Sequence, residues 1–179
     1  MKPWFIATEH FDPSNGDAWT KYISWSGLNQ AEEIISLDPM LCPTVLPEIK
    51  EEYWPYIVNE DSMLNFFTDL DFLLRQVSET ERKNLLCVFR DPTVHPEIPR
   101  NLRNFEFVGY DLVDIRGSTS AITNCGGFPD VFENSELNSK GLLSELTRAI
   151  DVQRQLKNKH PEEHHANCHV WAIYKHNEL

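Results

Sequence analysis

The sequence has no long hydrophobic run and little positive charge. No stretch of its 179 residues approaches the roughly 18 apolar residues that a membrane-spanning helix needs. The first residues, Met1 to Asp12, hold a short apolar patch followed by acidic side chains, so no signal-peptide core is predicted. With 16 Lys and Arg against 28 Asp and Glu, the net charge is −12. We therefore expect a cytoplasmic protein that binds neither nucleic acid nor membrane, because an acidic surface repels phosphate groups.

Motifs of the common enzyme classes are also missing. The sequence contains no glycine-rich phosphate loop and no GxSxG, HExxH or EF-hand pattern. Its four cysteines are widely spaced and form no CxxC pair, which predicts reduced thiols that are mostly buried. These absences leave most nucleotide-binding and hydrolase functions without support. The cysteines are Cys42, Cys87, Cys125 and Cys168.

Four segments have the composition of β-strands. Residues 85–89 form an apolar run that predicts an inner strand. Residues 105–123 alternate in polarity and turn at Arg116-Gly117, which predicts a β-hairpin. Two further strands are predicted, at residues 4–8 and 170–174.

Helices are predicted where apolar residues recur at helical spacing. Such spacing predicts a helix over 28–35, a helix that Asp61 or Ser62 caps and that ends at Val77, and a helix over 142–156. Prolines within residues 38–56 predict a long ordered loop there, and three-residue spacing suits a short helix around Trp19, Tyr22 and Trp25. Hydrophobic residues make up 41% of the chain, enough for a sizeable core. The mixed order of elements predicts a single α+β domain over residues 1–179, with a largely antiparallel sheet and packed helices.

Aromatic and acidic residues in the N-terminal part predict a surface that binds a partner protein. Trp and Tyr dominate the energetics of protein interfaces, and carboxylates around them suit a basic partner. The alternative is that the aromatic side chains fill the core while the carboxylates solvate a loop. The predicted partner-binding residues are Trp54, Tyr53, Glu51, Glu52, Trp25 and Trp19.

Histidine and cysteine side chains concentrate before the last predicted strand, and they suggest a zinc site as an alternative function. Imidazole and thiolate are ligands that Zn²⁺ prefers. The residues are His164, His165, Cys168 and His169, with Cys125 arriving from the loop Asn124–Phe128 if the two segments meet. Their spacing matches no zinc finger or ribbon, and alternation along a strand sends Cys168 and His169 to opposite faces. No cofactor is expected if the residues instead form a polar turn.

Two residues raise the question of an enzyme. The thiol of Cys125 precedes Gly126 and Gly127, whose backbone N–H groups would suit an oxyanion, with a downstream histidine as base. Such a nucleophile needs a lowered pKa, whereas the structural alternative is a turn that uses the glycines for their backbone freedom. Asp111 is the one acidic residue on an apolar strand face, for which we expect a structural polar contact.

Three stretches of the sequence, Ser36–Pro43, Gly109–Asp114 and Ser120–Gly127, resemble those of uncharacterised small bacterial proteins. In size and acidity the chain is similar to cytoplasmic immunity proteins, which neutralise polymorphic toxins. The resemblance implies a bacterial protein without chemistry of its own that occludes a basic partner. It assigns no catalytic residue.

Overall fold

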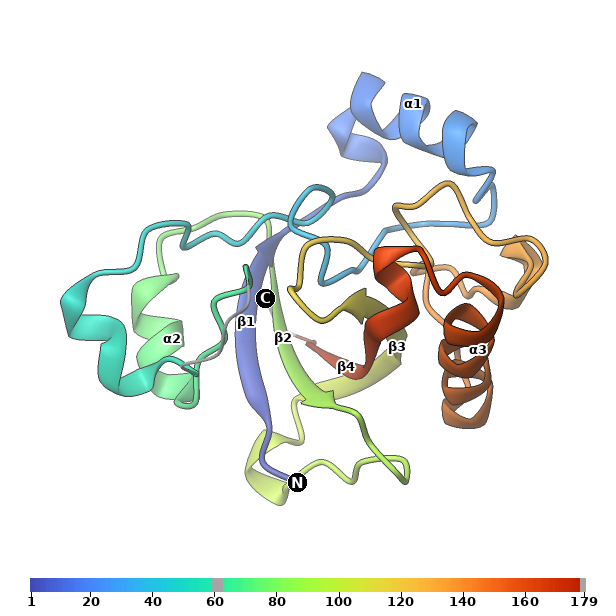
Figure 1. The fold of residues 1–179 in the computed structure, drawn as a ribbon. Helices are drawn as coiled ribbons and strands as arrows, with labels where there is room; N and C mark the ends of the chain where they lie inside the picture. Colours follow the sequence, from blue (N-terminus) through green and yellow to red (C-terminus); the bar gives the residue numbers. More distant parts are fainter. Residues whose placement is uncertain (59–62, 178–179) are drawn as a thin grey trace.

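The computed structural model describes residues 1–58 and 63–177. Within them, four antiparallel strands form one sheet in the order β1-β2-β4-β3, with three α-helices around it (Figure 1). The predicted α+β fold with a largely antiparallel sheet is confirmed. The strands and α-helices are β1 (Trp4–Glu9), α1 (Asp17–Ser26), α2 (Leu70–Gln76), β2 (Lys83–Arg90), β3 (Phe105–Asp114), α3 (Leu146–Lys159) and β4 (Cys168–His176). Short 3₁₀ helices are η1 (Pro13–Asn15), η2 (Glu51–Tyr56), η3 (Arg100–Leu102), η4 (Asn134–Glu136) and η5 (His164–Asn167).

The sheet contains the strands predicted at residues 4–8, 85–89 and 170–174 and the first part of the predicted hairpin, but not the second strand of that hairpin. β2 is an inner strand, as expected, and all of its residues except Arg90 are buried. β3 pairs with β4 and not with residues 118–123, which contribute only a single bridge between Val113 and Ser120. The prediction of a hairpin was wrong because Asp114 accepts hydrogen bonds from the backbone N–H groups that follow it, which curls the chain into a turn. The donors are Arg116 N, Ser118 N and Thr119 N.

Both edges of the sheet are covered by short segments of irregular chain. On the β1 edge, Phe5 and Phe67 exchange two backbone hydrogen bonds of 2.7 and 2.8 Å. On the β3 edge, Tyr110 and Leu143 do the same at 2.8 and 3.1 Å. These contacts occupy backbone groups that would otherwise invite pairing with another chain.

Three predicted helices differ from the structure. Residues 28–35 form no helix, because the N–H groups of Ile34 and Ile35 donate to the carbonyls of Phe11 and Lys140 across the fold. α2 begins only after Asp69, whose side chain accepts from Phe72 N at 2.8 Å. The predicted caps Asp61 and Ser62 lie outside the described residues. α3 begins at Leu146 and not at residue 142, because Leu143 belongs to the bridge with β3.

A buried ion pair fixes the segment before Leu37 to the sheet. Lys175 Nζ in β4 donates to both carboxylate oxygens of Glu33 at 2.9 Å, and Asn84 Nδ2 in β2 donates to one of them at 2.9 Å. The ammonium group of Lys140 lies 3.5 Å from the same carboxylate. This arrangement compensates the burial of Glu33, which is nearly complete.

Acid is expected to weaken the fold through Glu33. Burial acts to raise the pKa of Glu33, but hydrogen bonds from Lys175 and Asn84, with the charges of Lys175 and Lys140, outweigh it and lower the pKa below the ordinary 4.5. A carboxyl group whose pKa is lower in the folded chain than in the unfolded chain stabilises the fold at pH values above its unfolded pKa. That stability is lost as the pH falls through the pKa of the folded chain.

The free energy of unfolding should therefore decrease once the pH drops below about 4.5, in urea titrations from neutral pH to about pH 3. We expect Glu33→Gln to lower the free energy of unfolding by about 1–2 kcal/mol at neutral pH. The further decrease of this free energy in acid should be smaller in Glu33→Gln than in wild type. Glu32→Gln, at the exposed neighbouring position, should leave the acid response unchanged. The same acid response in wild type and Glu33→Gln would contradict this assignment.

Candidate functional site

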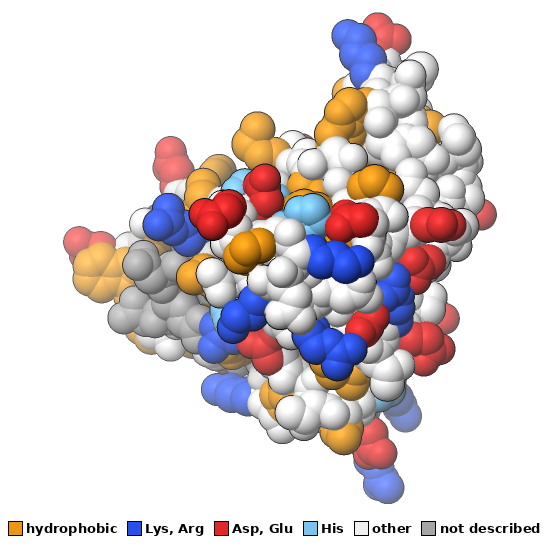
Figure 2. Space-filling model, turned by 45° about the vertical axis from the view of Figure 1, so that its right-hand side comes forward, with side chains coloured by type: hydrophobic (Ala, Val, Ile, Leu, Met, Phe, Trp, Pro, Cys, Tyr) orange, Lys and Arg blue, Asp and Glu red, His pale blue; other side chains and the backbone are white. Residues whose placement is uncertain are grey.

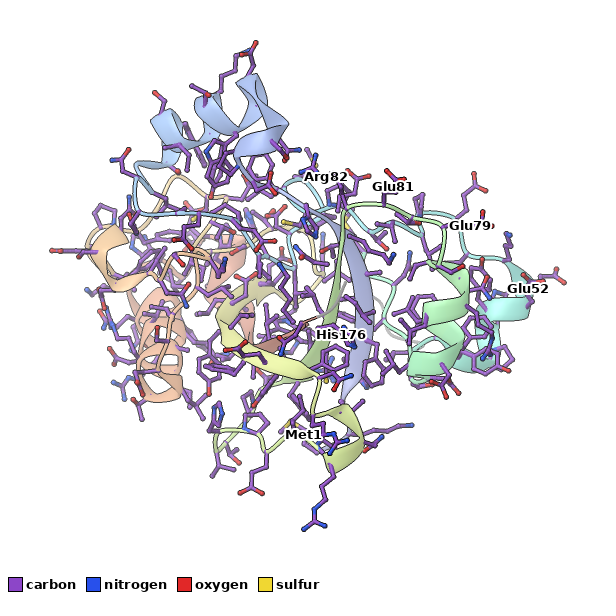
Figure 3. All side chains as sticks on the ribbon, turned by 180° about the vertical axis from the view of Figure 1, so that it is seen from behind. Met1, Glu52, Glu79, Glu81, Arg82 and His176 are labelled. Atoms are coloured by element: carbon purple, nitrogen blue, oxygen red, sulfur yellow. The ribbon has the colours of Figure 1, made fainter. Side chains whose placement is uncertain are left out.

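The 3₁₀ helix η2 presents one tryptophan and two carboxylates to solvent. Trp54 is 67% exposed, and Glu51 and Glu52 are exposed beside it. Glu52 projects outward at the end of the molecule that η2 and α2 form (Figure 3). We call the exposed residues Glu51, Glu52 and Trp54 the η2 platform.

The buried residue of the same helix, Tyr53, holds the η2 platform in place. Its side chain is only 3% exposed, and its ring lies edge-on to Phe72 with a centroid distance of 5.5 Å. Its hydroxyl group donates to Gln76 Oε1 at 3.1 Å, and Tyr56 stacks on Phe72 at 4.0 Å. Tyr53 is therefore a core residue and does not reach the predicted partner surface, but it fixes the helix that carries Trp54.

The other two predicted tryptophans lie far from η2. Trp19 is buried in α1 against Phe11, at a ring distance of 5.5 Å, so it too is a core residue. Trp25 is 55% exposed and borders a cleft of about 290 Å³ whose lining includes Phe128 and Phe132. Because α1 and η2 lie at opposite ends of the molecule (Figure 1), the six predicted residues do not form one surface.

Charged side chains of both signs lie on the side of the molecule that carries the η2 platform. Glu79 and Glu81, both exposed, lie on the same side of the molecule as Glu52 (Figure 3). Of the nearby cations, Lys50 lies over the ring of Tyr53 at 5.7 Å and Arg75 over a neighbouring ring at 5.8 Å. Arg82, which lies beside Glu81 in Figure 3, pairs with Asp12 at 3.0 Å.

A different face of the molecule has mixed charge. In Figure 2, acidic and basic side chains are interspersed, hydrophobic side chains form small separate groups, and histidine side chains lie beside acidic ones. Such a surface is typical of a solvated face, since scattered apolar side chains need no partner.

The histidines of η5 come together with a carboxylate that the sequence analysis did not single out. Within residues 1–58 and 63–177, one group of three potential metal ligands, Glu163, His164 and His165, has one ligand atom from each residue within 4.8 Å of the other two. Glu163 and His164 are exposed, whereas His165 is 2% exposed. Glu163 directly precedes His164 in the sequence, so a search for mixed carboxylate and imidazole ligands would have found it.

His165 is a buried histidine without a hydrogen-bond partner. Neither Nδ1 nor Nε2 of its ring has one. Burial lowers its pKa to about 4, and the neighbouring His164 acts in the same direction. The ring of Phe128 lies edge-on to it at 5.6 Å, so the loop Asn124–Phe128 meets the histidine segment.

The structure does not bring the predicted thiol ligands into this group. The Cys125 thiol donates to the carbonyl of Ala121 at 2.6 Å, and burial raises its pKa to about 11. Cys168 is buried, and burial raises its pKa to about 12. His169 is paired elsewhere, with Nδ1 2.6 Å from a carboxylate oxygen of Asp91. A raised pKa is the opposite of what a cysteine nucleophile needs.

Asp111 has the structural role that the sequence analysis expects. Its fully buried carboxylate accepts hydrogen bonds from Ser36 Oγ at 2.7 Å, Leu37 N at 2.9 Å and Ser120 Oγ at 2.6 Å, besides one from the next residue. Nearby, Asp38 is also fully buried and accepts from Ser120 N at 2.7 Å. These bonds join β3 to two loops, so both carboxylates maintain the fold.

Comparisons of the chain with models of protein families, with curated proteins and with solved structures gave no match. Among the described helices, none has the length and apolar character that a membrane crossing requires. Two places in the described residues combine exposed side chains with suitable chemistry: the η2 platform, and the group formed by Glu163, His164 and His165.

Proposed function

We propose that this chain is a non-catalytic protein-binding domain and that the η2 platform contacts a basic partner. The observation that carries the proposal is the exposure of Trp54 on a helix that Tyr53 anchors in the core. Exposure of so large an apolar side chain on a fixed backbone is typical of an interface anchor, because little conformational entropy is lost when a partner covers it.

The charges around Trp54 support a basic partner. Glu51 and Glu52 belong to the same helix, and Glu79 and Glu81 lie on the same side of the molecule (Figure 3). Carboxylates at the rim of an interface accelerate encounter with a cationic surface, and salt screens that effect. The partner should therefore associate more slowly as the ionic strength rises.

More specifically, we propose that the chain is a cytoplasmic immunity protein. The size of the chain and its net charge of −12 are similar to those of proteins that neutralise toxins. The chain would act by occlusion: the acidic residues steer the encounter, and the tryptophan anchor slows dissociation. Neither step needs a cofactor or a nucleophile.

Replacing Trp54 by alanine is expected to weaken binding of the partner by about 30-fold or more, which corresponds to the loss of about 2 kcal/mol at an interface anchor. The partner is first captured from host extract on immobilised wild-type chain and identified by mass spectrometry, and its association and dissociation rates are then measured for each variant. Glu52→Gln should reduce only the association rate, by a few-fold and at low salt. The dissociation rate should increase in Trp54→Ala.

Trp25→Ala is the matched control, because Trp25 is another half-exposed tryptophan at the far end of the molecule. It should leave the affinity unchanged. Equal, small effects of Trp54→Ala and Trp25→Ala would contradict the assignment of the surface. Chemical modification of the captured partner by the chain would contradict a non-catalytic function.

A further inference from the structure

We propose that Glu163, His164 and His165 form a binding site for one Zn²⁺ ion. This proposal is independent of the protein-binding function, because the three residues belong to η5 and to the residue before it, whereas the binding surface belongs to η2. It also replaces the ligand set predicted from the sequence: His164 and His165 remain and Glu163 is added, whereas both cysteines and His169 are removed.

The first observation is the state of the His165 ring. A neutral imidazole has one N–H donor and one acceptor nitrogen, and both of these atoms in His165 are buried without a hydrogen-bond partner. Leaving a buried polar group unsatisfied costs about 1–3 kcal/mol. A metal ion bound to the acceptor nitrogen would satisfy it and remove its share of this cost. The ring of His165 therefore has the properties of a metal ligand.

The second, independent observation is the convergence of three ligand atoms. The nearest ligand atoms of Glu163, His164 and His165 lie within 4.8 Å of one another, and the two imidazole rings are 4.0 Å apart at an angle of 37°. Tetrahedral Zn²⁺ with bonds of about 2.0–2.2 Å needs ligand atoms roughly 3.3 Å apart. The exposed side chains of Glu163 and His164 are free to close that difference by rotation, while Phe128 packs against His165.

Three carboxylates add negative potential at the His165 ring. The charges of Asp114, Glu163 and Asp38 act to raise the pKa of His165, although burial and His164 outweigh them. Asp114 already accepts hydrogen bonds from Ser118 and from backbone N–H groups, so it contributes charge without competing for a place among the ligands. A negative potential of this kind stabilises a bound divalent ion.

The donor set selects zinc over the harder cations. Two imidazole nitrogens and one carboxylate suit Zn²⁺ and other late first-row ions, whereas Ca²⁺ and Mg²⁺ prefer oxygen ligands alone. Three protein ligands leave the fourth tetrahedral position to water, which is the arrangement of an open zinc site. The exposure of Glu163 and His164 provides the path by which the ion enters from solvent.

The test is a titration of untagged, chelator-treated protein with ZnCl₂, followed by calorimetry and native mass spectrometry. We expect one Zn²⁺ ion per chain, and an affinity that falls by about 100-fold or more in Glu163→Gln and in His164→Gln. Loss of a residue that hydrogen-bonds to a metal ligand already lowers metal affinity by about 10–100-fold, so loss of the ligand itself should lower the affinity at least as much. Both side chains are exposed, so these variants should keep their fold.

Two neighbouring residues provide matched controls. Glu162 is an exposed carboxylate adjacent to Glu163, and His160 contacts the same Phe128 ring at 4.8 Å but lies outside the ligand group. Glu162→Gln and His160→Gln should bind Zn²⁺ with nearly wild-type affinity. The absence of stoichiometric binding would overturn the proposal, as would equal losses in the control and ligand variants. A loss produced by Cys125→Ser or Cys168→Ser, with no loss in His164→Gln, would overturn it in favour of a thiolate site.

Discussion

Replacing Asp111 by alanine is expected to lower the free energy of unfolding by about 3–5 kcal/mol, because each buried donor left unsatisfied costs about 1–3 kcal/mol. This is a large part of the roughly 5–15 kcal/mol that is typical of a whole domain. The carboxylate is fully buried and accepts four hydrogen bonds. Its removal leaves buried donors on three segments of the chain without an acceptor, and each unsatisfied donor adds to the cost. Urea unfolding followed by tryptophan fluorescence measures the loss.

Two further variants separate this network from a general effect of lost charge. Asp71→Ala removes an exposed carboxylate on α2 and should change the free energy of unfolding by no more than about 0.5 kcal/mol. Asp111→Asn keeps the shape of the side chain but turns an NH₂ group towards hydrogen-bond donors. Its free energy of unfolding should therefore lie between those of wild type and Asp111→Ala. A loss below about 1 kcal/mol in Asp111→Ala would contradict the proposed role of the carboxylate in joining β3 to the loops.

The sheet could be predicted from the sequence because each strand has a local signal. The apolar run at 85–89 and the aromatic strand at 170–174 both form inner strands, since burial on two faces needs apolar residues throughout. The pairing of the strands could not be predicted. β3 pairs with β4, more than 50 residues away in the sequence, and no local pattern encodes that choice.

The helices show the limit of periodicity. Ile34 and Ile35 recur at helical spacing with Leu28, yet they are buried in irregular chain whose backbone groups bind distant carbonyls. Burial alone produces the same spacing of apolar residues as an amphipathic helix does, so the pattern does not distinguish the two. The start of α2 depends likewise on which acidic residue caps the helix in the folded chain. That residue is Asp69, so the helix begins at Leu70.

The sequence predicts which types of residue form the candidate sites, but not which individual residues belong to each site. The sequence places Tyr53 and Trp54 side by side, and only the fold decides that the first is buried and the second exposed. It also places His164 and His165 next to Glu163, but the predicted ligand set combines imidazole with thiolate and omits this carboxylate. Which residues share a site depends on turns such as η5 and on the hydrogen bond that holds the Cys125 thiol away.

Replacing Gly109 by alanine is expected to destabilise the fold by about 3–5 kcal/mol, because backbone strain and a steric clash add together. Gly109 has a φ of +144°, a conformation that residues with a Cβ rarely adopt. A Cβ atom there would lie 2.5 Å from Leu142 Cβ and 2.9 Å from the carbonyl oxygen of Leu143. The second contact is with backbone, so relief requires a shift of the segment that bridges the edge strand at Tyr110.

Gly127→Ala separates the strain from the clash. Gly127 also has a positive φ, of +83°, but no atom lies within 4 Å of a Cβ built there. It should therefore cost only the strain, about 1–2 kcal/mol, in the same urea titration. Because Gly109 follows the irregularity in the register of β3, its variant should also lose protection of the Leu143 amide in hydrogen exchange, which Gly127→Ala should leave intact. Equal costs for the two variants would show that the edge segment yields to the added methyl group, and the close packing of residues 142–143 on β3 would then not determine stability.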